Sequence, residues 1–371
     1  MAQAETKRVR YAVIGAGNIA QVAILPAFRN ATENSELVAL ISGEREKREA
    51  LARRHNLIFT GGYDDLERVL AEGRIDAVYI TVPNSLHRGF AERAATHGVH
   101  VLCEKPLAET VEDCEAMIRA CATRNLKLMT AYRLHFEEAT LRAIDLVKSG
   151  AIGQPRLFTA SFTQQVRAGD VRTKKSLGGG ALYDMGVYCI NAARNLFRDE
   201  PEEVVALSTG GIDDRFDGVD ETTSCVLRFS GGRLAQLSAS LGTASTSSYT
   251  LIGSKGSLRV EPAFDYTVPL VHHLTVGDKT TTTTFEVRDQ FAPELVHFSR
   301  AILEHGEPGP SGEEGLADVR IVRALLQSAQ ENRSVRLLPQ VRAHRPDLRQ
   351  LIKKPAIKPP PTIDAPAPRQ S

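Results

Sequence analysis

The first third of the chain alternates between short apolar runs and longer stretches in which apolar residues recur at helical spacing. Runs rich in β-forming residues predict strands at 8–14, 37–41, 75–81, 99–103 and 126–130. Helical spacing predicts helices at 62–72, 85–97 and 110–124. Because a helix between two strands carries the chain back to the start of the sheet, this alternation predicts a parallel sheet with crossover helices.

The pattern changes after residue 148, where strands follow one another with few helices between them. Strands are predicted at 156–164, 225–229, 234–240, 249–252, 257–260, 270–276 and 280–287. Helices are predicted at 178–197, 290–305 and 313–331. Turns that contain glycine join several of these strands into hairpins. The second part of the chain is therefore predicted to be an α+β unit with a large, mostly antiparallel open sheet.

A glycine turn follows the first predicted strand and reads Gly15-Ala16-Gly17-Asn18-Ile19-Ala20. Gly15 permits a tight turn, Gly17 lets a pyrophosphate approach the backbone, and Ala20 allows close packing of helix on strand. At the start of a βαβ series this motif predicts a Rossmann dinucleotide-binding domain, with a purely structural glycine turn as the alternative. Gly15, Gly17, Asn18 and Ile19 are the predicted cofactor contacts.

These patterns divide the chain into three segments. Residues 1–130 are assigned to the α/β Rossmann domain, and residues 131–338 to an α+β domain for substrate binding and oligomerisation. From residue 339 onward the composition shifts to proline with scattered lysine and arginine, which cannot bury a core. Residues 339–371 are therefore predicted to be a disordered tail, with an arm that embraces a neighbouring subunit as the alternative.

The end of the second predicted strand indicates which dinucleotide is bound. Many NAD sites place an acidic residue there to hold the ribose 2′-hydroxyl group. This chain has Ser42-Gly43 followed by the cations Arg45 and Lys47, which fit a 2′-phosphate better. NADP is the expected cofactor, with NAD as the alternative because Glu44 could turn toward a ribose. The segment could also be no more than the solvated start of a helix.

The ends of the later strands meet at one edge of a parallel sheet, where such folds bind ligands. Predicted contacts at this edge are Thr81, Pro83, Asn84, His87, Glu104, Lys105 and Arg133. Lys105 precedes a proline and is therefore held extended, so that its charge could stabilise a reacting oxygen. His87 could equally be a structural residue at a helix start. Arg133 and the nearby His135 could equally be surface residues.

The segment 178–197, GGGALYDMGVYCINAARNLF, is apolar on most sides of a helix. At about 100° per residue, Asp184, Tyr188, Asn191 and Asn195 fall within roughly 60° of one another. A helix of this kind is expected to be buried, with its polar stripe facing a cleft. The alternative is a core helix whose polar side chains satisfy each other.

Composition and charge exclude several classes of function. The 371 residues carry a formal net charge of +1, so no general attraction to nucleic acid or to anionic membranes is expected. No stretch has the length of a membrane span or of an export signal, which favours a cytoplasmic protein. The five cysteines contain no CxxC pair and the histidines no HExxH motif, so reduced thiols and no metal site are expected.

Together these motifs resemble the Gfo/Idh/MocA oxidoreductase family from about residue 9 to 338. The resemblance rests on the segments 15–20 and 81–84, on Glu104-Lys105-Pro106, and on the glycine-led helix with Asp184. Tyr188, the Ser42-Gly43 turn, and the segment 311–315 followed by Asp318-Val319-Arg320 resemble its glucose–fructose oxidoreductase branch and the NADP-dependent aldose dehydrogenases. The resemblance implies an oligomer, a dimer or tetramer, formed through the second-domain sheet.

The resemblance also implies a reaction, hydride transfer between NADP and a sugar or polyol, with oxidation of an aldose at C1 expected. Tyrosine has a pKa of about 10 and is a poor base at neutral pH. A neighbouring ammonium that lowers this pKa by about 3 units contributes roughly 4 kcal/mol. Tyr188 is therefore expected to be the acid/base and Lys105 its electrostatic partner. Asp184 and Asn191 are expected to contact the substrate.

Two departures from the family pattern qualify this expectation. Most members carry histidine where this chain has Tyr188 and aspartate where it has Asn191, which disfavours an inositol-dehydrogenase mechanism. A reductase of a ketose or anhydrosugar and a dihydrodiol dehydrogenase remain alternatives. A non-catalytic regulator that binds NADP is an alternative of another class, disfavoured because Lys105, Asp184 and Tyr188 occur together.

Overall fold

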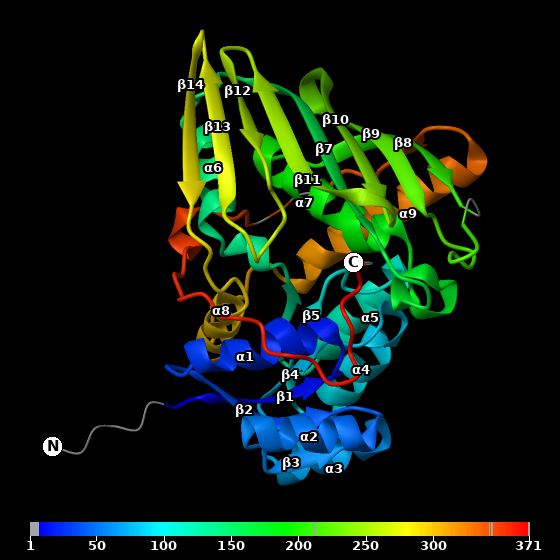
Figure 1. Ribbon diagram of the computed structural model, residues 1–371, viewed down its shortest axis with the longest axis vertical. Helices are drawn as coiled ribbons and strands as arrows, with labels where there is room; N and C mark the ends of the chain where they lie inside the picture. The colour runs from blue at the N-terminus through cyan, green and yellow to red at the C-terminus, as the bar shows by residue number, and fades with distance from the viewer. Residues whose placement is uncertain (1–6, 211–212, 341, 343, 370–371) are drawn as a thin grey trace, which may run out of the picture.

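Two sheets organise the computed structural model (Figure 1), which describes residues 7–210, 213–340, 342 and 344–369. Parts of the predicted first and second domains and of the tail (residues 1–6, 211–212, 341, 343 and 370–371) lie outside the described residues. A six-stranded sheet forms the first domain and a nine-stranded sheet the second. The predicted α/β plus α+β architecture is confirmed.

All six strands of the first sheet are parallel, in the order β3-β2-β1-β4-β5-β6. They span Val9–Ile14 (β1), Ser35–Ile41 (β2), Phe59–Gly61 (β3), Ala77–Ile80 (β4), His100–Glu104 (β5) and Leu128–Ala131 (β6). The order reverses direction beside β1, where β2 lies on one side and β4 on the other. Ligands bind at such a switch point, outside the carboxyl ends of the strands.

Helices cover both faces of this sheet because its strands are buried on both sides. Alternate residues of one strand reach opposite cores, as Ile14 and Val13 of β1 do. One core lies under α3 (Leu66–Glu72), α4 (His87–Thr96) and α5 (Val111–Ala122). The other lies under the π-helical turn Ala20–Ile24 and α1 (Leu25–Ala27). A further helix, α2 (Arg45–His55), follows β2.

Two helices from the second half of the chain return to the first domain. The helix α8 (Ala292–Leu303) packs on β1 and β2 beside α1, and α9 (Gly312–Glu331) packs on α5 and β6 (Figure 1). The same α9 also packs on β8 of the second sheet. The cores of the two domains are therefore joined through these helices, which a division of the sequence at residue 130 does not capture.

The second sheet has the order β14-β13-β12-β11-β7-β10-β9-β8-β15. Its strands are β7 (Pro155–Gln165), β8 (Pro201–Thr209), β9 (Thr222–Phe229), β10 (Arg233–Ser240), β11 (Gly242–Gly253), β12 (Gly256–Val260), β13 (Leu270–Val276), β14 (Lys279–Phe285) and β15 (Val335–Arg336). The central pairing of β7 with β10 is parallel, whereas the other pairings are antiparallel. Helices α6 (Glu138–Lys148), α7 (Val187–Phe197) and α9 pack on one face of the sheet.

The proline-rich tail has a defined path, which differs from the predicted disorder. The segment shown in red in Figure 1 passes α1 and ends between the two domains. Its backbone exchanges hydrogen bonds with the side chain of Gln21, since Gln21 Nε2 donates to Ile363 O and Ile363 N donates to Gln21 Oε1. The tail has no core of its own, but these hydrogen bonds hold it on the surface of the first domain.

All five cysteines are buried and unpaired, in agreement with the expected reduced thiols. Among the described residues no helix combines the length and the apolarity needed to cross a bilayer. The same residues contain no group of three or more histidine, cysteine, aspartate or glutamate side chains placed to hold a metal ion.

Candidate active site

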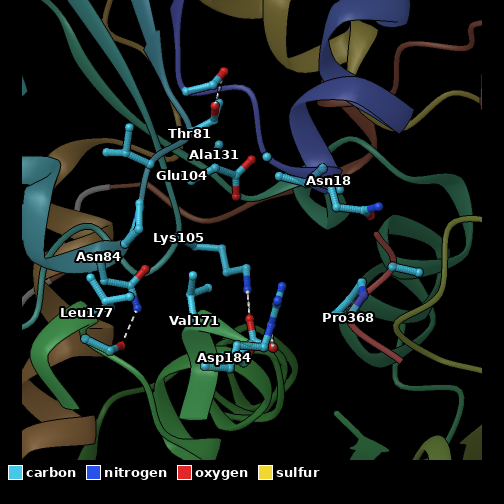
Figure 2. A pocket seen from close by; sticks show the side chains of 18 of the residues that line it. Asn18, Thr81, Asn84, Glu104, Lys105, Ala131, Val171, Leu177, Asp184 and Pro368 are labelled. Atoms are coloured by element: carbon cyan, nitrogen blue, oxygen red, sulfur yellow. Dashed lines mark hydrogen bonds and ion pairs between the residues drawn. The ribbon is translucent and has the colours of Figure 1, made fainter. Parts of the chain in front are cut away.

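A cavity of about 570 Å³ lies at the carboxyl edge of the first sheet, between the two domains. The glycine turn after β1 and the ends of β4 and β5 form its floor, and the start of the helix that leads into α7 faces them (Figure 2). The loop at Phe264 and the end of the tail complete the wall. The cavity therefore brings together sequence segments from positions 15 to 369.

The glycine turn has the geometry that a pyrophosphate requires. Gly15 has a φ of +109°, and a Cβ atom there would lie 2.7 Å from Thr81 Oγ1 and 2.8 Å from Thr81 O. A Cβ atom on Gly17 would meet no atom within 4 Å, so its backbone is open to an approaching group. Asn18 and Ile19 also line the cavity. These residues fit a dinucleotide phosphate against the start of the following helix.

The end of β2 forms a second part of the cavity, lined by Ser42, Glu44, Lys47 and Tyr63. Lys47 is 7% exposed, and its Nζ atom lies 2.5 Å from Glu44 Oε1. The small hydroxyl group of Ser42 and the buried ammonium group of Lys47 fit a phosphate, because Lys47 can exchange Glu44 for an anionic ligand. This end of the cavity is suited to a ribose that carries a 2′-phosphate.

Two residues that were predicted to contact the cofactor here, Arg45 and Gly43, do not line the cavity. Arg45 is exposed and pairs with Glu49 at 2.7 Å, and it does not line the cavity. It lies two positions before Lys47, about 200° around the same helix, so the two side chains point in different directions. Gly43 also lies outside the lining, where it packs against the ring of Tyr63.

Lys105 extends from the end of β5 into the cavity (Figure 2). Its Nζ atom donates to the backbone oxygen of Asp184 at 3.1 Å and to Asp184 Oδ1 at 3.2 Å. The same atom lies 4.7 Å from the centroid of the Tyr188 ring. Burial lowers the pKa of Lys105, but Tyr188, Asp184 and Glu104 outweigh it, so that the pKa is raised above its usual value. Lys105 is therefore an ammonium ion at neutral pH.

Arg172 completes this group, although no motif in the sequence singled it out. Its Nε atom lies 2.6 Å from Asp184 Oδ2, and its Nη1 atom lies 3.1 Å from Asp170 Oδ1. Burial raises the pKa of Asp184, but Arg172 and Lys105 outweigh it and lower the pKa to about 2. Asp184 is thus ionised at neutral pH and paired with two cations, which makes it a weak proton acceptor.

Arg133 lies on the other side of the Tyr188 ring. Its guanidinium carbon is 5.2 Å from the ring centroid. The buried side chain donates to Phe264 O at 2.5 Å and to Gln290 Oε1, which fixes its orientation. Tyr188 therefore faces two cations, Lys105 and Arg133, and its ring is held by Phe162 and Phe264 at centroid distances of 5.4 and 6.0 Å.

The predicted helix at 178–197 begins later than its sequence pattern indicated. Gly178 and Gly180 have φ values of +73° and +126°, and the helix starts with a π-helical turn over Leu182–Gly186 that runs into α7. Asp220 occupies the space beside Gly180, where a Cβ atom would lie 2.3 Å from Asp220 Oδ1, and it accepts a hydrogen bond from Leu182 N at 3.0 Å. The glycines therefore form a turn and not a helical start.

That turn is tied to the first domain. Asn84 Nδ2 donates to Gly178 O at 2.7 Å (Figure 2), and Thr81 Oγ1 donates to Ile14 O at 3.0 Å. Pro83 lines the cavity between them. The polar residues at the end of β4 thus connect the glycine turn after β1 with the start of the second-domain helix.

Asn191 and Asn195 share a helix face with Tyr188 but lie outside the cavity lining. Asn191 donates to Glu314 at 3.0 Å and to Asp318 at 2.7 Å, and its oxygen lies 2.9 Å from His135 Nε2. Asn191 lies deeper than Tyr188, because three positions along a helix, at 1.5 Å per residue, separate two side chains by about 4.5 Å along the helix axis. The stripe enters a buried polar cluster, so Asn191 is not placed for the predicted substrate contact.

His87 is also buried and lies outside the cavity lining. Its Nε2 atom is 3.0 Å from Val82 O, and its Nδ1 atom is 3.1 Å from Pro106 O. Burial lowers the pKa of His87 despite these carbonyl groups. The imidazole therefore connects the backbone beyond β4 with that beyond β5, which is the structural alternative that the sequence had left open.

A pair of carboxyl groups, Glu104 and Glu294, lies in the wall of the cavity around Tyr79. The Tyr79 hydroxyl lies 3.0 Å from Glu104 Oε1 and 3.3 Å from Glu294 Oε2, while Glu294 Oε1 is buried and has no hydrogen-bond partner. Burial, reinforced by the charge of Glu104, raises the pKa of Glu294 well above its usual range. An ionised Glu294 is therefore costly to the folded protein.

Glu294→Gln is expected to stabilise the cofactor-free protein at alkaline pH. Where folding raises the pKa of a carboxyl group, the folded protein loses stability as the pH rises from the ordinary pKa of that group toward the raised pKa. The variant lacks this loss, so its advantage should grow with pH to at least about 1.4 kcal/mol, the equivalent of one pKa unit. Urea unfolding between pH 5 and 9 measures the difference, and Glu286→Gln, at a carboxyl group 80% exposed, is the control. Parallel pH profiles for all three proteins would contradict the expectation.

Comparison with known proteins adds independent information. The profile of an oxidoreductase family with an NAD-binding Rossmann fold, Gfo/Idh/MocA, matches residues 9–132, and that of the Gfo/Idh/MocA C-terminal domain matches residues 140–259. A D-xylose 1-dehydrogenase [NADP(+)] of Haloarcula marismortui is 32% identical over 340 residues, which are 89% of this chain and 93% of that protein.

Solved structures give similar results. An aldose-aldose oxidoreductase from Caulobacter crescentus, solved with glycerol, has a TM-score of 0.85 and 35% identity, with 89% of this chain and 100% of the other covered. A 3-ketoreductase from Actinomadura kijaniata, solved with NADP and TDP-benzene, has a TM-score of 0.80 and 30% identity, with 87% and 98% covered. These similarities extend over both domains.

Proposed function

The chain belongs to the Gfo/Idh/MocA family of oxidoreductases, and from that premise we propose that it oxidises an aldose at C1 with NADP. The general class of activity is that of an NADP-dependent carbohydrate oxidoreductase. The observation that carries the proposal is one cavity in which a phosphate-binding glycine turn, a lysine ammonium and a tyrosine meet. A sugar or polyol that enters this cavity would lie between Lys105 and the start of α7.

The residues of the cavity fit NADP. Gly17 offers open backbone for the pyrophosphate, and Ser42 and Lys47 offer a hydroxyl group and a buried cation for the 2′-phosphate. When bound, the cofactor supplies the acceptor for the hydride that leaves the substrate carbon. The protein has to bind and orient the substrate and to take up the hydroxyl proton.

Tyr188 is proposed to accept that proton and Lys105 to stabilise the resulting phenolate. The Lys105 ammonium lies 4.7 Å from the ring centroid and the Arg133 guanidinium carbon lies 5.2 Å from it, so that two positive charges face the ring. Asp184, tied to Lys105 and Arg172, keeps the ammonium in position. Its remaining lone pairs are proposed to orient a substrate hydroxyl group.

Lys47→Ala is expected to weaken NADP binding roughly 10- to 150-fold, because a hydrogen bond to a charged group contributes about 1.5–3 kcal/mol. Affinity for NAD should change much less, since NAD lacks the 2′-phosphate. Arg45→Ala is the matched comparison: Arg45 is exposed and pairs with Glu49, so its removal should change NADP affinity less than about threefold. Fluorescence titration with NADPH and NADH measures both variants. A larger effect at Arg45 than at Lys47 would reverse the assignment.

The direct test of the proposed function is turnover. The purified protein is mixed with NADP and a panel of aldoses, polyols and cyclic diols, and the absorbance of the reduced cofactor is followed. The proposal expects an aldose to give the highest kcat/KM and the corresponding lactone as product. Reaction with polyols or diols but with no aldose would refute C1 oxidation.

Reduction of a sugar ketone is the second candidate. The observation that favours it is the relationship to dTDP-3,4-didehydro-2,6-dideoxy-alpha-D-glucose 3-reductase of Streptomyces violaceoruber, 36% identical over 313 residues. The same panel with NADPH and with ketoses or an anhydrosugar distinguishes the two reactions. Tight NADP binding without turnover in either direction would favour a non-catalytic regulator.

We also propose that the protein forms a dimer or tetramer through the outer face of the second sheet. Leu157, Leu234 and Ile252 occupy paired positions on neighbouring strands and are 37–40% exposed. Leu207 of β8 is 71% exposed. Apolar side chains aligned in this way favour burial against a second copy, and light scattering measures the mass in solution.

A further inference from the structure

The end of the C-terminal tail lies against the cavity, and this contact has no place in the function proposed above. Ala367, Pro368 and Arg369 line the cavity together with the glycine turn, and Figure 2 shows Pro368 on the same side as Asn18. We propose that residues 361–369, here called the strap, belong to the cofactor site and have to lift before the dinucleotide can leave. The proposal rests on NADP binding as proposed above.

One half of the strap is fastened to the element that receives the pyrophosphate. Gln21 is fully buried, and its amide nitrogen donates to both Ala16 O and Ile363 O at 2.9 Å. Its oxygen accepts from Ile363 N at 2.7 Å. Asn18 Nδ2 donates to Ala365 O at 2.9 Å. The strap is therefore bound by side chains of the glycine turn and of the helix that follows it.

The other half of the strap is fastened to the second domain. Arg167 N donates to Pro368 O at 3.0 Å, and Val166 forms an antiparallel β-bridge with Arg369. The Arg369 side chain donates to Gln164 Oε1 at 3.4 Å and lies 3.7 Å from Asp265 Oδ2. Gln164 and Asp265 both line the cavity. The strap thus crosses from one domain to the other beside the cavity.

The strap is held by a few hydrogen bonds and little apolar burial. Ala365 is buried at 7% exposure, whereas Pro366, Ala367 and Arg369 are exposed. Segments with few buried apolar contacts open locally without unfolding the protein. The strap can therefore leave its place while both domains stay folded, and it can act as a barrier that opens.

The chain is also longer than the framework that it shares with a solved relative. The aldose-aldose oxidoreductase from Caulobacter crescentus is matched over 100% of its length by 89% of this chain. About a tenth of this chain therefore has no counterpart in that relative. A retention element specific to this protein is compatible with that surplus.

The test uses two forms of the protein that move the strap in opposite directions. One form ends at residue 360 and lacks the strap. The other carries Val166→Cys with Arg369→Cys, because partners in an antiparallel bridge lie at a distance that a disulfide can span. The two single-cysteine variants are the matched controls, and the native cysteines are all buried. Each protein is loaded with NADPH, and its release into excess NADP is followed by stopped-flow fluorescence.

The shortened form is expected to release NADPH at least tenfold faster than the full chain. The oxidised double-cysteine form is expected to release it at least tenfold more slowly, and a reductant should restore the original rate. Amide hydrogen exchange at Ile363 should slow when NADPH is bound to the full chain. Release rates that agree within twofold in all forms would overturn the strap while leaving NADP binding intact. Absence of NADPH binding in the full chain would overturn the proposed function and the strap together.

Discussion

Tyr188→Phe is expected to lower turnover roughly 100- to 10,000-fold, the range that a positioned acid/base contributes, and to leave NADPH affinity unchanged. Phenylalanine keeps the ring, which packs on Phe162 and Phe264 and faces the Lys105 ammonium. Only the hydroxyl group is lost, and with it the proposed proton acceptor. Steady-state kinetics with the preferred sugar and fluorescence titration with NADPH separate the two effects.

Tyr266→Phe is the matched control for this experiment. Tyr266 lines the same cavity, and its ring centroid lies 5.1 Å from the Arg133 guanidinium carbon, so the substitution removes a second phenol from a comparable environment. Its turnover should stay within about threefold of the parent protein. If Tyr188→Phe retains turnover within tenfold, or if both variants lose it equally, Tyr188 has no special role as acid/base.

The sequence predicted the first domain well because its signals are local. Each strand of a parallel sheet is buried on both faces and therefore appears as a continuous apolar run. The glycine turn follows β1 directly, so strand, turn and helix could be recognised together. The two omissions have local reasons as well: β3 (Phe59–Gly61) has only three residues, and α2 (Arg45–His55) is mostly charged and has too few apolar residues to show a helical pattern.

The second sheet was predicted less completely. Turns that contain glycine predicted its hairpins. The hairpin of β9 and β10 and the hairpin of β13 and β14 were both recognised in this way. The parallel pairing of β7 with β10 joins residues 155–165 to residues 233–240, and no local pattern marks a pairing over that separation. Sequence reasoning therefore predicted a mostly antiparallel sheet and missed its central parallel pair.

Within the candidate site, the sequence singled out residues that lie at predicted strand ends or in a regular helix. Lys105, Asp184 and Tyr188 belong to this class, and the structure brings them together. Arg172 lies in a single 3-10 turn of three residues (Val171–Thr173), and Arg369 lies near the end of a segment whose composition predicted disorder. Both reach the cavity through long-range packing, which one sequence does not reveal. Asn191 shows the converse, because a common helix face does not guarantee a common depth.

Arg194→Met is expected to lower the free energy of unfolding by about 3–5 kcal/mol, the usual cost of removing one partner from a buried ion pair. Arg194 is 0% exposed and lies 2.5 Å from Glu200, 3.2 Å from Glu314 and 2.5 Å from Asp318. Methionine fills a similar volume but leaves these carboxylates short of one positive charge. Urea unfolding at neutral pH measures the loss. Arg68→Met, at an exposed arginine paired with Glu72, should cost less than about 1 kcal/mol.

The pH dependence separates a lost charge from lost packing in this variant. Burial raises the pKa of Asp318 to about 6 even though Arg194 opposes the shift, so removal of Arg194 should raise this pKa further. A carboxyl group whose pKa is higher in the folded state binds more protons there, and folding is then favoured as the pH falls. The stability difference between Arg194→Met and the parent protein should therefore shrink between pH 8 and pH 5. A difference independent of pH would mean that the methionine packs badly and that the charges of this cluster contribute little.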